Sequence, residues 1–107
     1  DLEVGVLGMS LPDPAACVLH AAFPNPFNGQ TRIVFDLPTG GGHVRLSIHD
    51  LLGRPIRTLE DRELGEGRYS VSWNGCDRSG TRLSSGLYLC RLETGSEQRV
   101  SKLVLLQ

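Results

Sequence analysis

The chain has 107 residues and a mass of 11.7 kDa, which is the size of a single domain. Its formal net charge of −1 argues against a nucleic-acid partner, because proteins that bind nucleic acids usually carry a basic excess on one face. No apolar run approaches the roughly 18 residues that a transmembrane helix needs, so we expect no membrane span. Thirteen glycines and six prolines predict many turns.

Alternation of apolar and polar residues is the dominant pattern along the chain, and helical spacing is rare. Residues 31–37, 44–50 and 68–73 each place apolar side chains on one face and polar side chains on the other. Such segments are typical of antiparallel strands with one buried and one solvated face. Residues 87–92 and 100–106 are apolar on both faces, which indicates strands that are central or covered.

Turn-forming residues separate these segments. The glycine run 40–42 predicts a hairpin turn, and residues 94–97 predict the final hairpin. A first strand near 18–22 and a short one at 56–59 bring the count to about seven strands. We therefore predict an all-β fold, an immunoglobulin-like antiparallel β-sandwich of about seven strands, over residues 17–107.

The inward-facing positions of these strands predict one hydrophobic core between two sheets. We expect each fully buried member to contribute about 1.5–3 kcal/mol. Trp73 is the largest of them, and its replacement by Ala is expected to cost about 3–5 kcal/mol. The predicted core consists of Ile33, Phe35, Leu37, Val44, Leu46, Ile48, Ile56, Leu59, Tyr69, Val71, Trp73, Leu87, Leu89, Leu92, Val100 and Val104.

Three cysteines, Cys17, Cys76 and Cys90, cannot form a closed set of disulfides because their number is odd. Two interpretations stay open: three buried thiols, or one disulfide with one free thiol. Their spacing matches no zinc-binding pattern, and we expect neither a metal nor a cofactor.

Catalytic patterns are also missing from the sequence. Turns separate His20, His43 and His49, and we expect these side chains at a solvated rim. No serine lies in a Gly-x-Ser-x-Gly motif. The sequence therefore predicts no catalytic residue and no enzymatic activity.

Two acidic residues, Asp36 and Asp50, are expected on neighbouring strands. Arg32 and Arg45 lie close to them in the predicted sheet, so we expect surface ion pairs rather than a functional pair of carboxylates. Such exposed pairs contribute about 0–1 kcal/mol each.

Five motifs, in order and without large gaps, resemble one bacterial family. Their sequences here are FPNPFN with TRIVFDLP (23–38), IHDLLGRPI (48–56), GRYSVSWNG (67–75), SGLYLCRL (85–92) and KLVLL (102–106). Together they are similar to Ig-like domains related to that of the flagellar hook-capping protein, a group that overlaps with the sorting domains of type IX secretion. The resemblance implies a seven-stranded sandwich at the end of an extracellular or surface protein, and no catalysis.

The sequence departs from the family pattern at three positions. His49 and Cys90 replace aromatic residues, and Asn74 replaces an Asp. Family members with several acids in the following loop could hold a cation there. Asp77 is the only carboxylate between residues 73 and 83, whereas calcium takes six to eight oxygen ligands, so we expect no calcium site.

The Phe-Pro-Asn-Pro-Phe segment has a structural interpretation. Pro24 and Pro26 lack backbone N–H groups, so they can end a strand and stop further pairing at a sheet edge. Phe23 and Phe27 are then expected to plug the open end of the sandwich.

Gly53 and Gly86 are expected at positive φ or in close backbone contact. The glycine run 40–42 is not followed by a helix, so it lacks the helix N-terminus on which many phosphate sites depend. The motif residues to which we assign a structural role are Pro24, Asn25, Pro26, Phe27, Gly53, Trp73, Gly86 and Tyr88.

Residues 1–16 lie outside the resemblance and predict an extended N-terminal arm or linker, closed by the Pro12-Asp13-Pro14 sequence. The arm is either the tail of an upstream domain or a strand that adds to a sheet edge, on its own chain or on a neighbour. The candidate assembly residues are Leu2, Val4, Val6, Leu7, Met9 and Leu11.

Three functional hypotheses compete. The first is a non-enzymatic extracellular Ig-like module for export sorting or cell-surface attachment of a larger bacterial protein, with secretion or surface machinery as its protein partner. The second is a structural subunit of an extracellular filament, a homopolymer that assembles by strand addition through the arm. The third, a carbohydrate-binding module, needs exposed aromatics, and most of the six aromatics are assigned to the core.

Overall fold

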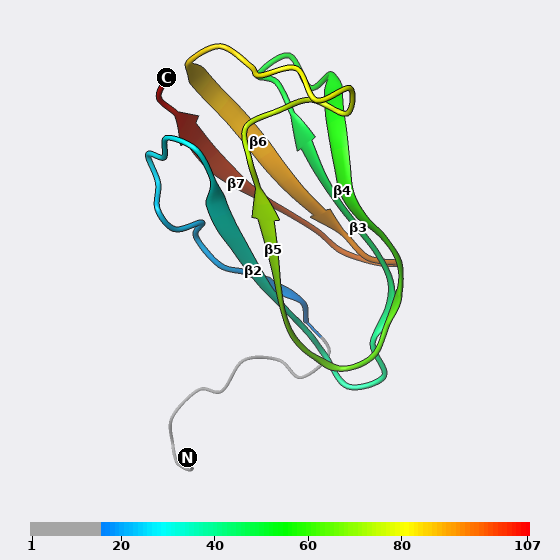
Figure 1. Ribbon diagram of the computed structural model, residues 1–107. Helices are drawn as coiled ribbons and strands as arrows, with labels where there is room; N and C mark the ends of the chain where they lie inside the picture. The colour runs from blue at the N-terminus through cyan, green and yellow to red at the C-terminus, as the bar shows by residue number, and fades with distance from the viewer. Residues whose placement is uncertain (1–15) are drawn as a thin grey trace.

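The computed structural model describes residues 16–107 as seven strands with no helix among them (Figure 1). None of these residues belongs to a helix long and apolar enough to cross a membrane. The strands are β1 (Val18–Leu19), β2 (Thr31–Leu37), β3 (Gly42–His49), β4 (Pro55–Leu64), β5 (Gly67–Trp73), β6 (Gly86–Glu93) and β7 (Gln98–Leu105).

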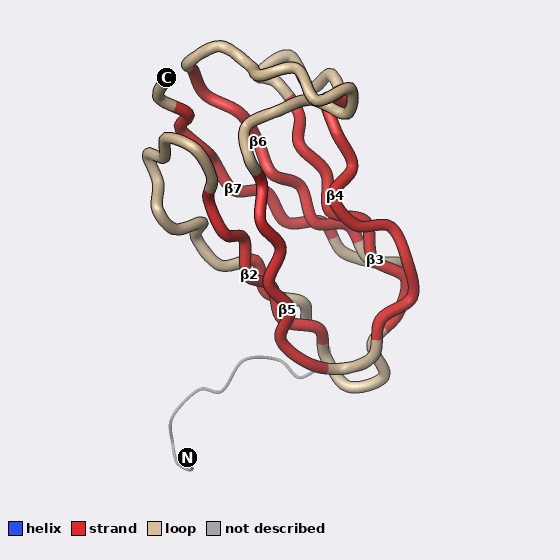
Figure 2. Tube along the Cα trace, viewed as in Figure 1, coloured by secondary structure: helices blue, strands red, loops and turns tan. Residues whose placement is uncertain are grey.

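Two antiparallel sheets face each other, which confirms the predicted all-β, Ig-like sandwich (Figure 2). The smaller sheet has the order β1-β2-β5, and the larger has the order β4-β3-β6-β7. The hairpins β3–β4 and β6–β7 lie within the larger sheet, and the Thr94 N–H donates to the Glu97 carbonyl at 2.9 Å, as expected for the final hairpin.

The glycine run 40–42 does not form the predicted hairpin. It connects β2 in one sheet to β3 in the other, so it is an arch between the sheets. Turn-forming residues end a strand both in a hairpin and in an arch. The packing of the two sheets decides which sheet the next strand joins. The arch requires a glycine at Gly41, where φ is 61° and a Cβ would overlap the backbone oxygen of Leu64.

The predicted core is confirmed along β2 and β3, where alternation correctly marks the buried face, and at Trp73 of β5 and Leu92 of β6. The predicted core residues that are buried are Ile33, Phe35, Leu37, Val44, Leu46, Ile48, Trp73 and Leu92. Those that are partly buried and pack against the core are Ile56, Leu59, Tyr69 and Val71.

The predicted facing is wrong for β7 and for the first part of β6, before Leu92. Leu87 is 42% exposed and Val100 is 53% exposed, while Leu89 and Val104 are half-buried. The core instead receives the opposite faces of both strands. Because these strands are apolar on both faces, alternation could not identify the inward one, and a shift of one residue exchanges the faces. The buried side chains are Tyr88, Cys90, Leu92, Leu103 and Leu105.

All three cysteines are buried free thiols, the first of the two interpretations left open by their number. Burial raises the pKa of Cys90 to about 12. Burial, followed by the neighbouring Glu97, also raises the pKa of Cys17. These thiols therefore act as small apolar groups in the interior.

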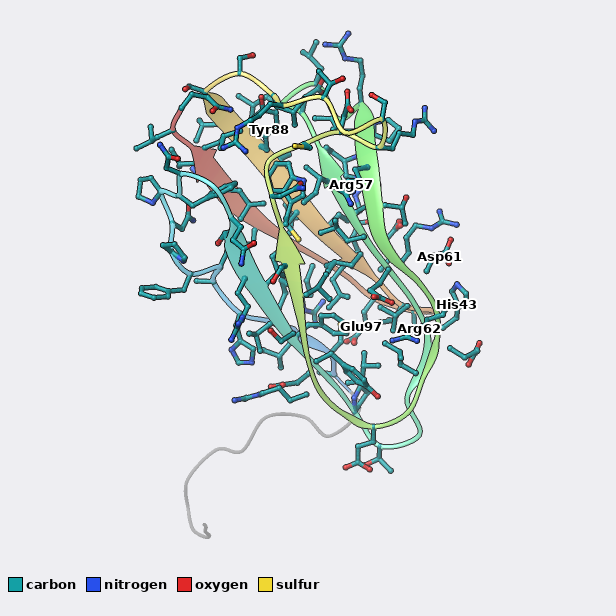
Figure 3. The ribbon with its side chains drawn as sticks, in the orientation of Figure 1. His43, Arg57, Asp61, Arg62, Tyr88 and Glu97 are labelled. Atoms are coloured by element: carbon teal, nitrogen blue, oxygen red, sulfur yellow. The ribbon has the colours of Figure 1, made fainter. Side chains whose placement is uncertain are left out.

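Two histidines lie at the rim as expected, with acidic partners. His20 Nε2 lies 2.8 Å from an oxygen of Asp36, and His43 pairs with Asp61 across β3 and β4 (Figure 3). His49, which was also expected at the rim, is only 6% exposed. Its Nδ1 faces the carbonyl of Gly53 at 3.3 Å, which can only accept a hydrogen bond. In the neutral ring, Nε2 therefore accepts from the Ser47 hydroxyl at 2.9 Å.

Asp36 and Asp50 form ion pairs, but with other partners than predicted. Asp36 lies on β2 of the smaller sheet, while Asp50 follows β3 in the larger, so they are not on neighbouring strands. Arg68 lies opposite Asp36 on β5 and donates to it at 2.8 Å. Arg54, four residues after Asp50, donates to Asp50 at 2.8 Å. Predicting neighbours from chain order fails here because consecutive strands belong to different sheets.

Replacement of Gly41 by Ala is expected to lower the free energy of unfolding more than replacement of Gly40. Gly40 has φ of 91° with open space around an added methyl group, so its cost is the left-handed backbone alone, about 1–2 kcal/mol. At Gly41 the overlap with the Leu64 carbonyl adds to that cost. Urea unfolding of the two variants measures the difference, and equal losses would contradict a steric requirement at Gly41.

The Asp36–Arg68 pair is expected to make stability depend on pH. Hydrogen bonding to Arg68, with a smaller contribution from His20, lowers the pKa of Asp36 from its ordinary 3.8 to about 2. The stabilisation is therefore present above pH 4 and is lost as the pH falls towards 2. Asp36→Asn should cost about 1–2 kcal/mol at pH 6 and almost nothing at pH 2 in chemical denaturation. An equal cost at both values would contradict this linkage.

Candidate functional site

The outer edge of β7 is the feature from which a candidate interaction surface is built. In a strand, alternate residues direct their backbone N–H and C=O groups to the same side. Hydrogen bonds made on the outer side by Lys102, Val104 and Leu106 show that even-numbered residues of β7 face this edge. Odd-numbered residues therefore pair with β6. An uncovered edge of this kind is a template for pairing with another strand.

Asn25 covers part of this edge with its side chain. Its Nδ2 donates to the carbonyl of Lys102 at 3.0 Å, and its Oδ1 accepts from the N–H of Val104 at 2.8 Å. The side-chain amide thus presents to β7 the same donor and acceptor that a backbone amide would present. The flanking prolines, Pro24 and Pro26, have no N–H to leave unpaired, and both follow cis peptide bonds.

Phe27 continues this cover with its backbone. Its N–H donates to the Val104 carbonyl and its own carbonyl accepts from Leu106, both at 2.9 Å, which makes a short parallel bridge to β7. We call residues 23–28 the covering segment. It fills the edge from residue 102 to the end of β7.

An aromatic cluster holds the covering segment against the sandwich. The ring of Phe27 is buried, with its centroid 5.5 Å from that of Trp73. Tyr88 meets the Trp73 ring edge-on, with the two ring centroids 5.8 Å apart, near the end of the sandwich where β6 begins (Figure 3). The indole Nε1 donates to the Cys76 carbonyl at 2.9 Å, and the Tyr88 hydroxyl donates to the Ser84 carbonyl at 2.7 Å. The buried indole N–H of Trp73 and the hydroxyl of Tyr88 therefore each have a hydrogen-bond partner.

Phe23 does not plug the end of the sandwich, which corrects the expectation from the motif. Its side chain is 80% exposed, while Ala22 before it is buried. Its backbone N–H and carbonyl both pair with Arg32 at 3.0 Å, so the alternation of the extended chain directs Phe23 outwards. Thr31, buried beneath this segment, donates its hydroxyl to the Pro24 carbonyl at 2.6 Å.

The remaining motif residues lie apart from the covering segment or support it. Gly53, with φ of 84°, closes the β3–β4 turn through its N–H to the Asp50 carbonyl. Gly86, with φ of 158°, opens β6 opposite Leu105. The candidate assembly residues Leu2, Val4, Val6, Leu7, Met9 and Leu11 lie outside the described residues.

Sequence reasoning missed Gly75 as a site residue. It has φ of 75°, and a Cβ at this position would lie 3.2 Å from a methyl of Leu105 and 3.7 Å from the Phe27 ring. The sequence feature that marks Gly75 is the Asn-Gly pair after Trp73. This pair is typical of a turn, but it does not indicate a close approach to the aromatic cluster.

Acidic and thiol groups do not converge on a metal site within residues 16–107. Asp77, the acid of the β5–β6 loop, uses one carboxylate oxygen to accept from the N–H groups of Ser79 and Thr81 and from the Ser79 hydroxyl. These bonds lower its pKa and order the loop. The covering segment contacts β7 through hydrogen bonds to its backbone and contacts β5 through aromatic packing.

Removal of the Asn25 amide is expected to uncover the edge of β7. Asn25→Ala loses two hydrogen bonds and should lower the free energy of unfolding by about 1–2 kcal/mol. It should also speed hydrogen exchange at the Val104 amide. Asn28→Ala is the matched control, since Asn28 is exposed and makes no side-chain hydrogen bond to another described residue. Equal effects of the two substitutions would contradict the role given to Asn25.

Comparisons with known proteins identify the family. The model of the FlgD Ig-like domain family matches residues 22–98. No curated protein sequence matches the chain significantly.

Several solved structures are similar, among them those of PorU, PorZ and FlgD. PorU from Porphyromonas gingivalis, described as dimeric and latent, has a TM-score of 0.63 and 21% identity over 94% of this chain and 10% of PorU. PorZ, described as an essential surface component of the type IX secretion system of P. gingivalis, has a TM-score of 0.52 and 20% identity over 80% of this chain and 11% of PorZ. FlgD from Xanthomonas campestris, described in connection with hook capping, has a TM-score of 0.54 and 25% identity over 84% of this chain and 67% of FlgD.

The likeness to PorU and PorZ shows the fold, and the chain spans about a tenth of either protein. The family model, in contrast, covers the chain from just before the covering segment to the start of β7. The chain therefore belongs to the FlgD Ig-like domain family.

Proposed function

We propose that this domain is a non-enzymatic module that sorts a larger bacterial protein for export or attaches it to the cell surface, and that it works outside the cell. Its family membership supports a structural or secretion-related role. The likeness to a domain of PorZ, which is described as a surface component of type IX secretion, supports the extracellular setting.

The observation that carries this proposal is the way the fold uses its side chains. The aromatic cluster and the buried face of each strand take up most of the large apolar groups, and most of the described acids are engaged by neighbouring arginines, histidines or backbone N–H groups. What stays exposed is a set of apolar residues on turns, edges and outer faces, which suits contacts with other proteins. They are Phe23, Leu51, Leu52, Leu87, Val100 and Leu106.

Carbohydrate binding receives no comparable support. Of the six aromatic residues, all of which are described, Phe23 alone is exposed. The stacking platforms that bind sugars need several exposed aromatic faces, so we do not propose this function.

A reporter fusion tests the sorting role. The full chain, fused to the C-terminus of a periplasmic reporter in a host with type IX secretion, is expected to carry the reporter to the medium or the cell surface. The matched control is the same fusion in a host whose type IX translocon is disabled, where the reporter should stay in the periplasm. Retention in both hosts would count against the proposed role.

A second candidate function is a filament subunit that assembles by strand addition. It is favoured by one observation: the half of the β7 edge before residue 102 is not reached by the covering segment. Light scattering of the full chain at high concentration separates the two candidates, since a filament subunit must form particles much larger than 11.7 kDa.

A further inference from the structure

The turn between β3 and β4 presents two adjacent leucines to solvent. Leu51 is 58% exposed and Leu52 is 79% exposed, whereas the other exposed large apolar residues in the described part of the chain stand singly in the sequence. Turns usually consist of Gly, Asn, Asp, Ser or Pro, so the bend itself has no need of leucine at these positions. We call residues 50–54 the leucine turn.

Hydrogen bonds hold the leucine turn in one conformation. The N–H of Gly53 donates to the Asp50 carbonyl at 2.9 Å, and the N–H of Asp50 donates to the Arg54 carbonyl at 3.0 Å. The Asp50 carboxylate accepts from the N–H groups of Leu52 and Arg54, both at 2.9 Å, and from Arg54 Nε at 2.8 Å. Apolar side chains displayed on a fixed turn lose little conformational freedom on binding, which is the property of an interface anchor.

Positive charge surrounds the leucine turn. Together with the β5–β6 loop, it lies at the end of the sandwich where β6 begins (Figure 1). Residues 50–58 and 74–85, which form this end, contain four arginines and two aspartates, a net charge of +2 in a chain whose net charge is −1. Arg78 of the loop lies beside the turn, because it lines two surface hollows together with Pro55 and Ile56.

The two aspartates at this end direct their charge into their own loops. Asp77, like Asp50, accepts three hydrogen bonds, from the N–H groups of Ser79 and Thr81 and from the Ser79 hydroxyl. Arg78 forms no ion pair with another residue of the described chain, and the side chain of Arg54 is 72% exposed. This end therefore complements a surface that combines an apolar recess with carboxylates around it.

A protein groove fits these features better than a lipid bilayer does. Two leucines offer little apolar area for insertion into a membrane, where even a single myristoyl chain gives only marginal binding. A groove can enclose both leucines completely, and a turn of fixed shape matches a groove of fixed shape.

We propose that the leucine turn docks into an apolar groove with a carboxylate rim on a protein of the export or surface machinery. Leu51 and Leu52 fill the groove, and Arg54 and Arg78 pair with its rim. This inference rests on the proposed sorting or attachment function, for which it names the contact residues and the chemistry of the partner.

The reporter fusion tests the anchors. In the host with type IX secretion, Leu51→Ser/Leu52→Ser is expected to lower the ratio of exported to periplasmic reporter at least about tenfold, as truncation of interface anchors typically does for affinity. The matched control is Leu87→Thr/Val100→Thr, which removes two exposed apolar groups from the outer face of the larger sheet and keeps β-propensity. It should leave export unchanged. Urea unfolding of the full chains should show that both variants are folded, because all four side chains are exposed.

A charge reversal gives an independent readout that does not alter the leucines. Arg78→Glu places a like charge against the carboxylate rim, so export should fall several-fold. Arg32→Glu makes the same change at an exposed arginine on β2 of the smaller sheet and should leave export unchanged.

Vesicle sedimentation separates a protein groove from a lipid surface. The unmodified full chain and Leu51→Ser/Leu52→Ser should sediment equally little with vesicles of phosphatidylglycerol and phosphatidylcholine. Sedimentation of the unmodified chain that is lost in the variant would overturn the protein partner and assign the turn to a lipid surface.

The export results divide in the same way. Export of the unmodified fusion that is lost with the leucine-turn and Arg78 substitutions, and kept in both controls, supports the proposal. Equal export of the unmodified and leucine-turn fusions overturns the proposal and leaves the sorting role intact. Retention of every fusion, the unmodified one included, overturns the sorting role and the inference that rests on it.

Discussion

The packing of Trp73 against both Phe27 and Tyr88 is the contact on which the arrangement of this domain depends. It takes one aromatic ring from each of three segments that are distant in the sequence: the covering segment, β5 and β6. Because Phe27 is anchored there, its backbone lies along β7, and Asn25 is brought to the β7 edge. A single buried cluster thereby ties the smaller sheet to β6 and β7 of the larger sheet.

Sheet edges impose the second constraint, because an antiparallel sandwich leaves unpaired backbone groups wherever a sheet ends. This domain covers the last half of β7 with an asparagine side chain and prolines that have no N–H to expose. The cover is specific to residues 23–28, and it ends at residue 102. The edge before residue 102, where Val100 is 53% exposed, is not reached by this cover.

The sequence pattern predicts strands well where one face is polar and poorly where both faces are apolar. Along β2 and β3, polar residues such as Arg32 and Arg45 mark the outward face, so the buried face follows from alternation. In β6 apolar residues occupy both faces, and in β7 both faces mix polar and apolar residues, so neither strand marks its outward face. Alternation there favours Leu87 over Tyr88, although Tyr88 is the buried one. The sequence motifs include Asn25 and Trp73, but they do not show that both residues support the covering segment. The contacts that do so join the covering segment to β5 and β7, which are far from it in the sequence.

Strand number, turn positions and the class of fold could all be read from residues near each other in the chain, because alternation and turn chemistry are local. The partners of Asp36, the arch at Gly41, the burial of His49 and the bridge from Asn25 to β7 could not. Each depends on which sheet a strand joins, and that choice is made by packing two apolar faces together over long sequence separations. Local patterns specify what a strand can bury, whereas the assembled sandwich selects the neighbour against which it is buried.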